Sequence, residues 1–267
     1  MNELALFAGA GGGILGGKLL GWRTVCAVEW EPYPASVLVA RQNDGFLPPF
    51  PIWDDVCSFD GKPWRGIVDV VSGGFPCQDI SAAGKGAGIE GERSGMWGEM
   101  ARIIHEVQPR YVFVENSPML TSRGLGRVLG DLASMGFDAR WGVLGAADVG
   151  ANHKRDRIWI VAHATKLQRN GSNDHARVGM GREQISESGD CRWASDMADA
   201  HSSHGERNER PKRSLKKRAD LIQPSWWAIE PNVGRVVNGV AARVDRLKAI
   251  GNGQVPLCAA TAWRLLK

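Results

Sequence analysis

The chain has 267 residues, a net charge of +4 and a hydrophobic fraction of 43%. This length can bury the core of one large α/β domain, and no apolar run approaches the roughly 20 residues of a membrane-spanning helix. No basic leader precedes the first strand-like run, and the five cysteines are too scattered for a disulfide framework or a zinc site. We therefore expect a cytoplasmic protein that contacts no membrane and holds no metal.

The first predicted strand, residues 4–8, runs into the glycine-rich turn 9–13, and an apolar stripe after the turn predicts a helix. Glycines let the backbone approach a ligand closely, and the amino end of a helix favours negative charge. Nucleotides and related cofactors bind at such turns. The glycine spacing does not match a dinucleotide fingerprint, so the turn alone leaves the ligand open.

Acidic side chains stand at the ends of the next two predicted strands: Glu29 follows residues 24–28, and Asp55 lies at the end of residues 52–56. Glu29 stands about 20 residues after the first glycine, where a carboxylate can accept both ribose hydroxyls. Trp30 could stack on an adenine ring, and Asp55 could accept from an exocyclic amine. The alternative is a surface glutamate beside a tryptophan that packs in the core.

A fourth predicted strand, residues 68–71, is broken by two glycines and leads to Cys77. Pro76 fixes the backbone before the thiol, and polar residues follow it. These surroundings suit a nucleophile better than an inert thiol. A small buried cysteine is nevertheless the usual outcome, so the local residues leave both readings open.

A carboxylate and two arginines follow later apolar segments. Glu115 ends the predicted strand 111–114, where burial would raise its pKa and make it a proton donor near neutral pH. Arg155 and Arg157 precede the predicted strand 158–161 and would point to the same side. There they could hold a base carbonyl and a phosphate or brace Glu115. As isolated residues they would be surface charges.

The periodicity is lost after residue 164, and the basic run 207–218 follows. This run is either a phosphate-binding surface or a solvated loop. Helical patterns resume at 241–250 and in a last helix that ends at Leu266. We expect a core over residues 1–164, a small lobe or insertion over 165–234, and a C-terminal segment, 235–267, that returns to the core.

Taken together and in this order, the motifs resemble those of the DNA cytosine-5 methyltransferases, over nearly the whole chain except 165 to about 234. Ser117 and His153 depart from the valine and glutamine usual in the family. The matching segments are Phe7-Ala8-Gly9-Ala10-Gly11-Gly12, Glu29-Trp30, Asp55-Val56, Pro76-Cys77-Gln78, Glu115-Asn116-Ser117, His153-Lys154-Arg155-Asp156-Arg157 and Gly251-Asn252-Gly253-Gln254-Val255-Pro256.

The resemblance implies an α/β fold of the Rossmann-like class I methyltransferase type, with a mostly parallel central sheet and a small irregular target-recognition lobe. It also implies S-adenosyl-L-methionine as cofactor and S-adenosyl-L-homocysteine as product, without a metal. The residues expected to hold the cofactor are Phe7, Ala8, Gly9, Gly11, Gly12, Glu29, Trp30, Asp55, Val56, Gly73, Pro76, Trp97, Asn252 and Gln254.

By the same resemblance, Cys77 adds to C6 of a flipped-out cytosine and Glu115 protonates N3. Arg155 would lie at the cytosine O2, with Arg157 and Asn116 organising the pocket. The implied partner is double-stranded DNA, bound by a monomer beside which a cognate restriction endonuclease could act separately. Candidate DNA contacts are Gln78, Ser81, Lys85, Lys212, Arg213, Lys216 and Lys217.

Three alternatives differ in substrate or class. A tRNA cytosine-5 methyltransferase of the same ancestry would also suit a small lobe and a basic surface. A catalytically silent DNA-binding relative is disfavoured by the intact Cys77, Glu115 and Arg155. A nicotinamide-dependent dehydrogenase would explain the glycine turn and Glu29 but would give Cys77 no role.

Overall fold

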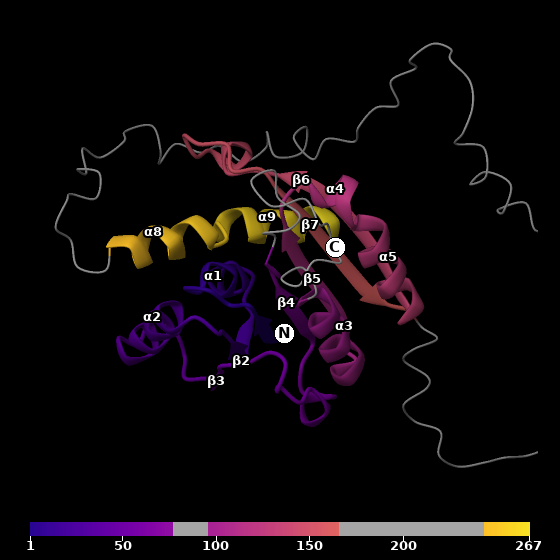
Figure 1. The fold of residues 1–267 in the computed structure, drawn as a ribbon, viewed down its shortest axis with the longest axis horizontal. Coiled ribbons are helices and arrows are strands. Elements are labelled where there is room, and N and C mark those ends of the chain that lie inside the picture. The colour runs from indigo at the N-terminus through magenta and orange to yellow at the C-terminus, as the bar shows by residue number, and fades with distance from the viewer. Residues whose placement is uncertain (77–95, 166–242) are drawn as a thin grey trace, which may run out of the picture.

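The computed structural model describes residues 1–76, 96–165 and 243–267. An α/β sandwich is formed by these three segments (Figure 1). Its strands are β1 Asn2–Leu6, β2 Arg23–Val28, β3 Ile52–Trp53, β4 Val70–Gly73, β5 Tyr111–Asn116, β6 Phe137–Leu144 and β7 Arg157–Ala164. Its α-helices are α1 Gly12–Leu19, α2 Pro32–Asn43, α3 Met96–Val107, α4 Leu120–Arg123, α5 Leu125–Ser134, α8 Arg243–Asn252 and α9 Pro256–Leu266, with short 3-10 turns η1 Lys62–Trp64 and η3 Ala147–Val149.

The strands form one sheet in the order β3-β2-β1-β4-β5-β7-β6. The pairs from β3 to β5 are parallel, and β7 runs antiparallel to both of its neighbours. The chain moves outward from β1 in one direction to β3 and then restarts at β4 on the other side of β1. The carboxyl ends of β1 and β4 therefore flank a topological switch point, where ligands bind in open α/β sheets.

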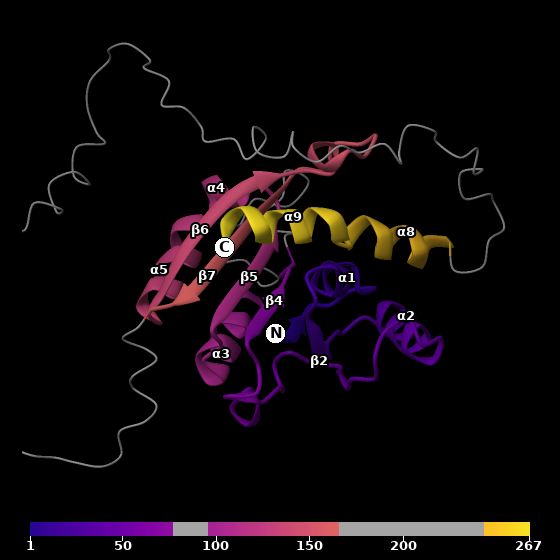
Figure 2. The same ribbon diagram turned by 180° about the vertical axis from the view of Figure 1, so that it is seen from behind.

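Alternating apolar residues give the sheet two covered faces. On one face Leu4, Val71 and Val112 belong to a core cluster with α3 and α5. On the other face Phe113 and Trp159 pack against α9. Figures 1 and 2 show these two helical layers from opposite sides, with α3 and α5 on one and α1 and α9 on the other.

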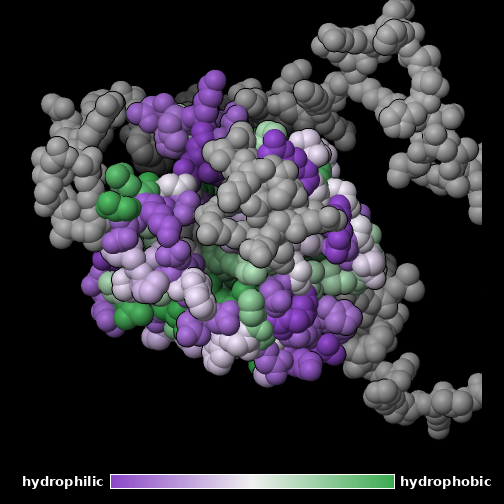
Figure 3. Space-filling model, viewed as in Figure 1, coloured by the Kyte–Doolittle hydropathy of each residue, from purple (hydrophilic) through white to green (hydrophobic). Residues whose placement is uncertain are grey.

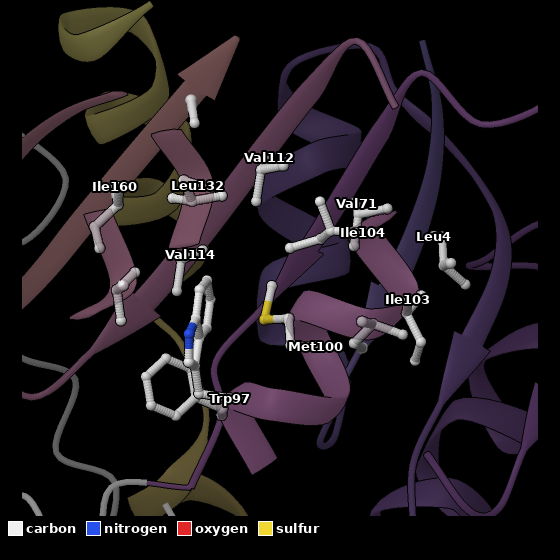
Figure 4. Close-up of a cluster of buried hydrophobic side chains, with 14 of the residues drawn as sticks. Leu4, Val71, Trp97, Met100, Ile103, Ile104, Val112, Val114, Leu132 and Ile160 are labelled. Atoms are coloured by element: carbon white, nitrogen blue, oxygen red, sulfur yellow. The ribbon is translucent and has the colours of Figure 1, made fainter. Parts of the chain in front are cut away.

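The helix α3 illustrates how the sequence sets the packing. Met100, Ile103 and Ile104 recur at helical spacing and are all fully buried. Figure 4 shows them facing Val71 and Val112 of the sheet. The face formed by these residues anchors the helix that follows the segment 77–95, which lies outside the described residues.

The predicted elements are found, with shifted ends. The first strand ends at Leu6 rather than at residue 8, and the fourth covers Val70–Gly73 rather than 68–71. The third strand stops at Trp53, because the Asp55 carboxylate accepts the Cys57 N–H and turns the chain away from the sheet.

The predicted lobe at 165–234 lies almost entirely outside the described residues, since only Thr165 of that range is described. Of the C-terminal segment, the residues from 243 onward are described, and Cys258 and Trp263 of α9 are buried against the sheet. Among the helices of the described ranges, none is both long and apolar enough to cross a membrane.

Candidate active site

A cavity of about 300 Å³ opens at the carboxyl ends of β1, β2, β4 and β5. Each of these strands contributes to the lining, either through its last residues or through the residues that follow it. A smaller adjoining cavity of about 40 Å³ lies at the switch point between β1 and β4. Both cavities are lined by Phe7, Gly9, Gly74, Glu115, Asn252 and Gly253.

The turn after β1 is shaped by backbone conformations that side chains rarely adopt. Phe7, Gly9 and Gly11 all have positive φ angles, of 51°, 55° and 89°. The Gly9 N–H donates to Oε2 of Glu29 at 2.6 Å, and the Glu31 N–H donates to Oε1 at 2.9 Å. The Glu29 carboxylate thereby ties the end of β2 to the glycine turn of β1.

Glu29 is 9% exposed. Its burial raises the pKa of the carboxyl group, while the hydrogen bonds from the Gly9 and Glu31 N–H groups lower that pKa. A carboxylate has about four lone-pair sites, so two acceptor positions remain after these bonds. Trp30 beside it is 71% exposed and lines the larger cavity. An unusually exposed tryptophan therefore stands next to an acceptor at the cavity mouth.

The rim of the larger cavity is partly apolar. Tyr33 of α2 and Ala249 of α8 contribute to the lining. Both helices carry exposed aliphatic side chains, and Figure 3 shows hydrophobic areas on this side of the surface. These side chains are Val39, Val244, Leu247 and Ile250.

Several of the predicted cofactor contacts lie away from both cavities. Asp55 uses its carboxylate to accept the Cys57 N–H, and Val56 is buried in the core. Trp97 is also buried, stacks at a tilt on Phe75 and donates its indole N–H to Asp131. Trp97 thus packs beneath the loop after β4, and the structure gives no support for it as a cavity residue.

Glu115 projects from the end of β5 between the guanidinium of Arg157 and the side-chain amide of Gln254. Arg157 Nε lies 2.8 Å from Glu115 Oε1, and Gln254 Nε2 lies 3.4 Å from Oε2. Burial raises the pKa of the Glu115 carboxyl, and the positive charges of Arg157 and Arg155 oppose that rise. A buried carboxyl with a raised pKa at a cavity wall is suited to donate a proton.

The neighbouring amide fixes the loop after β4. Asn116 is 2% exposed and donates its side-chain N–H to the Phe75 carbonyl at 3.0 Å. Pro76 follows and lines the cavity, so the described chain ends beside Glu115 immediately before Cys77. Outside the described residues lie the predicted nucleophile Cys77 and the predicted DNA contacts Gln78, Ser81, Lys85, Lys212, Arg213, Lys216 and Lys217.

The two arginines of the predicted pair have different partners. Arg157 begins β7 and lines the cavity beside Glu115. Arg155 precedes the strand with a positive φ of 42°, so strand alternation does not extend to it. Its guanidinium instead donates to the carbonyl oxygens of Ile250, Gly251 and Gly253. Of the two arginines, Arg157 is therefore the one that pairs with Glu115.

The turn between α8 and α9 closes the site from the C-terminal side. Asn252 lines both cavities, and Gln254 lies against the glycine turn. A Cβ added at Gly12 would stand 2.2 Å from the Gln254 carbonyl oxygen, and one at Gly13 would stand 2.6 Å from its Oε1. Only glycine fits at position 12, where the close atom is backbone, whereas a Cβ at position 13 would displace the Gln254 side chain. The predicted cofactor motifs at the two ends of the chain therefore pack directly together.

Sequence reasoning did not identify part of the cavity wall. Tyr33, Asp245 and Lys248 line it, and Lys248 Nζ lies 2.7 Å from Glu31 Oε1. This ion pair joins residues 217 positions apart in the chain. No local pattern signals such a pairing, and only the fold brings α8 to the start of α2.

The sheet order and the site at its switch point define the class as a Rossmann-like methyltransferase fold. Solved structures that share it include the following two. Entamoeba histolytica methyltransferase EhMeth matches with a TM-score of 0.53 and 15% identity over 70% of this chain and 57% of that one. A DNMT2 variant from Spodoptera frugiperda matches with a TM-score of 0.50 and 21% identity over 62% and 50%.

The family is more specific than the fold. The model of the C-5 cytosine-specific DNA methylase family matches residues 1–241, and the chain belongs to this family. Type II methyltransferase M.Eco47II of Escherichia coli is 36% identical over 170 residues, which are 60% of this chain and 38% of the relative. M.NgoBI of Neisseria gonorrhoeae is 34% identical over 62% and 51%. The matched region thus spans about half, or less, of these relatives.

Proposed function

We propose that this chain transfers a methyl group from S-adenosyl-L-methionine to C5 of a cytosine in duplex DNA. The observation that carries the proposal is the buried Glu115 carboxyl, braced by Arg157 at the wall of a cavity that the glycine turn also lines. The family membership and the Type II names of the relatives support DNA as the substrate and a restriction-modification setting.

The residues around the cavity fit the cofactor. Glu29 keeps acceptor capacity for ribose hydroxyls, and the exposed Trp30 offers a face for adenine. The turn from Phe7 to Gly13 brings backbone close to the smaller cavity, and Asn252 closes it. When bound there, S-adenosyl-L-methionine would supply an electrophilic methyl group to the base.

Cytosine C5 needs activation before it can accept a methyl group. The Cys77 thiolate would add to C6 while the protonated Glu115 gives its proton to N3, which makes C5 enamine-like. Arg157, which lines the cavity beside Glu115, is the better candidate for the cytosine O2 than Arg155, whose guanidinium is occupied elsewhere. After methylation, loss of the C5 proton would expel Cys77 and restore the base.

The target cytosine must leave the duplex to reach this site, because the ring is inaccessible inside the stack. Flipping costs a few kcal/mol, which phosphate and pocket contacts must recover. The candidate contacts for the phosphates, Ser81, Lys85 and the basic run 207–218, come from the sequence alone.

A mechanism-based trap tests the reaction. Duplex DNA with 5-fluorocytosine at the target should become covalently joined to the protein in the presence of cofactor, because fluorine cannot leave as a cation. Cys77→Ser should form no adduct, since an alcohol is far less ionised than a thiol. Glu115→Gln should slow trapping by withholding the N3 proton. Adduct formation by Cys77→Ser would contradict the assignment.

The substrate class is tested separately by comparing methyl transfer to duplex DNA and to tRNA. Transfer to duplex DNA with mapping of 5-methylcytosine would support the proposal and give the recognised site. Transfer to tRNA alone would replace it with the RNA enzyme of the same ancestry.

A further inference from the structure

The guanidinium of Arg155 lies at the carboxyl end of α8, away from the position expected for a substrate contact. Its Nη2 donates to the Gly251 carbonyl at 2.6 Å, to Ile250 at 3.3 Å and also to Gly253. The last carbonyls of a helix have no partner within the helix, and a cation there is favoured by the helix dipole. One side chain therefore caps the helix and fixes the turn that follows it.

The backbone around Arg155 is constrained by its neighbours. A φ of 42° is uncommon for a residue other than glycine and persists only where the surroundings enforce it. The preceding carbonyl, of Lys154, accepts the Ala146 N–H at 2.7 Å. A Cβ added at Gly145 would stand 2.5 Å from that same carbonyl oxygen, so the segment is tightly packed.

The turn held by Arg155 carries Gln254 to the second oxygen of Glu115. Gln254 Nε2 is 3.4 Å from Glu115 Oε2, while Arg157 takes Oε1 on the other side. A Cβ added at Gly74 would stand 2.5 Å from Oε2 and 3.1 Å from Gln254 Nε2. The carboxyl thus sits between β7, the loop after β4 and the C-terminal turn.

We propose that Arg155 and Gln254 are positioning residues for the Glu115 carboxyl. Arg155 donates hydrogen bonds to the carbonyl oxygens of Ile250, Gly251 and Gly253. These bonds fix the turn and so hold Gln254 against Glu115 Oε2. The proposal rests on the proposed role of Glu115 as proton donor. It assigns to the C-terminal segment a part in positioning the Glu115 carboxyl, besides the expected part in holding cofactor.

The charged groups that face Glu115 define the expected effects. Arg157 and Arg155 lower the pKa of the buried carboxyl, and the Gln254 amide lowers it as well by donating to the charged form. Loss of the amide should therefore raise the Glu115 pKa. It should also slow methyl transfer by on the order of tenfold, because the proton donor is no longer held in its productive orientation.

The test titrates Glu115 directly, by ¹³C NMR of the side-chain carboxyl in glutamate-labelled protein without cofactor or DNA. Gln254→Met should shift the Glu115 pKa upward. The matched control is Gln42→Met, which removes a glutamine that accepts the Phe50 N–H far from the site and should leave the pKa unchanged. An unchanged pKa in Gln254→Met would overturn the role of Gln254.

The second variant, Arg155→Lys, keeps the positive charge, but a lysine side chain is one atom shorter than the path to Nη2, the single nitrogen that contacts all three carbonyls. It should raise the Glu115 pKa as Gln254→Met does, and the double variant should shift it no further, because both act through one turn. An unchanged pKa in Arg155→Lys, or strictly additive shifts, would overturn the inference. Should Gln254→Met fail to fold, Gln254→Asn is too short to reach Glu115 and should give the same shift.

The titration also separates this inference from the proposed function. It requires no methyl transfer. A wild-type protein that modifies neither DNA nor tRNA would contradict the proposed function, while the titration would still test the contact between Gln254 and Glu115. If the wild type is active and the titration shows no shift in either variant, the positioning roles fail alone.

Discussion

Glu115 is a carboxyl whose ionisation is set by two opposing influences. Burial favours the neutral form and raises the pKa, while Arg157 and Arg155 favour the charged form. A group that must give a proton to N3 works only while it is protonated. The arrangement therefore keeps Glu115 protonated at higher pH than an exposed glutamate, as its proposed role requires, while the two arginines stabilise its charged form.

This balance predicts the pH dependence of the reaction. In the proposed role Glu115 acts in its protonated form, and its pKa is raised, so kcat/KM should fall as pH rises through the Glu115 pKa. The proposed Cys77 thiolate sets the opposite, ascending limb of the profile. Glu115→Gln should lower the rate by about 10² to 10⁴-fold and remove this descending limb. A pH–rate profile of both proteins is the measurement, and an unaltered limb in the variant would assign it to another group.

Trp30 should act on cofactor binding without acting on stability. Its side chain is 71% exposed, so Trp30→Ala should leave the melting temperature nearly unchanged. If the ring stacks on adenine, the variant should bind S-adenosyl-L-homocysteine about tenfold more weakly by calorimetry, while DNA binding persists. Trp141→Ala is the matched control, since Trp141 is 45% exposed on β6 and lines neither cavity. Equal affinities would remove Trp30 from the cofactor site.

The same residues show what a sequence can and cannot predict of a site. Glu29 and Trp30 come just after β2 and Glu115 lies near the end of β5, so the carboxyl-edge rule places all three at one cavity. Arg155 precedes its strand in a left-handed conformation, so the alternation rule used for it does not apply. Gln254 was expected at the cofactor, and its approach to Glu115 joins segments that are 139 positions apart.

At the scale of the element, β1 carries a buried carboxyl that no proposed step uses. Glu3 is 1% exposed and accepts from the Ser72 hydroxyl at 2.6 Å and the Thr24 hydroxyl at 2.8 Å, on the strands at either side. Burial raises its pKa to about 7, against the two hydroxyl bonds. The three central strands are thus joined through one carboxyl that is half protonated near neutral pH.

Glu3 should make stability fall as pH rises. Between 4.5 and about 7 the folded protein holds a proton that the unfolded chain has released. Its contribution to the free energy of unfolding is therefore largest below pH 4.5 and decreases by about 3 kcal/mol towards pH 7, above which it is constant. Glu3→Gln, which stays neutral, should flatten this part of the dependence.

The measurement is urea unfolding at several pH values between 4.5 and 8 for the wild type and Glu3→Gln. Glu29 and Glu115 also have raised pKa values, but they are present in both proteins and cancel in the comparison. Asp54→Asn serves as a control, because Asp54 is exposed. Parallel curves for wild type and Glu3→Gln would show that Glu3 ionises without affecting folding.

Element boundaries were harder to predict than element types. The composition of 52–56 indicates a strand, but the Asp55 carboxylate accepts the backbone N–H of Cys57, two residues on, and the strand ends at Trp53. The glycines at 73 and 74 indicate a break, yet Gly73 still pairs with both β1 and β5. A Cβ at Gly73 would lie 2.8 Å from the Leu6 carbonyl, so this glycine is required by close strand packing rather than by a turn.

At the scale of the molecule, the two ends of the chain form one structural unit. The helix α9 packs on the sheet through Trp263. Its ring lies edge to face with Trp22, at a centroid distance of 4.7 Å, and with Phe113, at a centroid distance of 5.5 Å. The helix also packs against α1, where Gly16 approaches Ala259 closely. The N-terminal glycine turn and the C-terminal turn are therefore held together by helix packing as well as by contacts in the site.

A substitution at Gly16 tests the packing of α1 against α9. A Cβ added there would lie 2.7 Å from the Ala259 Cβ and 3.1 Å from the Pro256 carbonyl oxygen, and backbone cannot yield cheaply. Alanine is favoured over glycine inside a helix by up to about 1 kcal/mol, so the sign of the change depends on packing. We expect Gly16→Ala to lower the free energy of unfolding by about 1 to 3 kcal/mol because α9 must move away from α1.

The control is Gly130→Ala in α5, where an added Cβ has nothing within 4 Å and should raise stability through helix propensity alone. Because Pro256 begins α9 directly after Gln254 and Val255, a displaced α9 should also move the C-terminal turn. Gly16→Ala should therefore weaken S-adenosyl-L-homocysteine binding, whereas Gly130→Ala should not. Urea unfolding and calorimetric titration measure the two effects. Equal stabilisation by both substitutions would mean that α1 and α9 are not tightly packed, and normal cofactor affinity in a destabilised Gly16→Ala would uncouple that packing from the site.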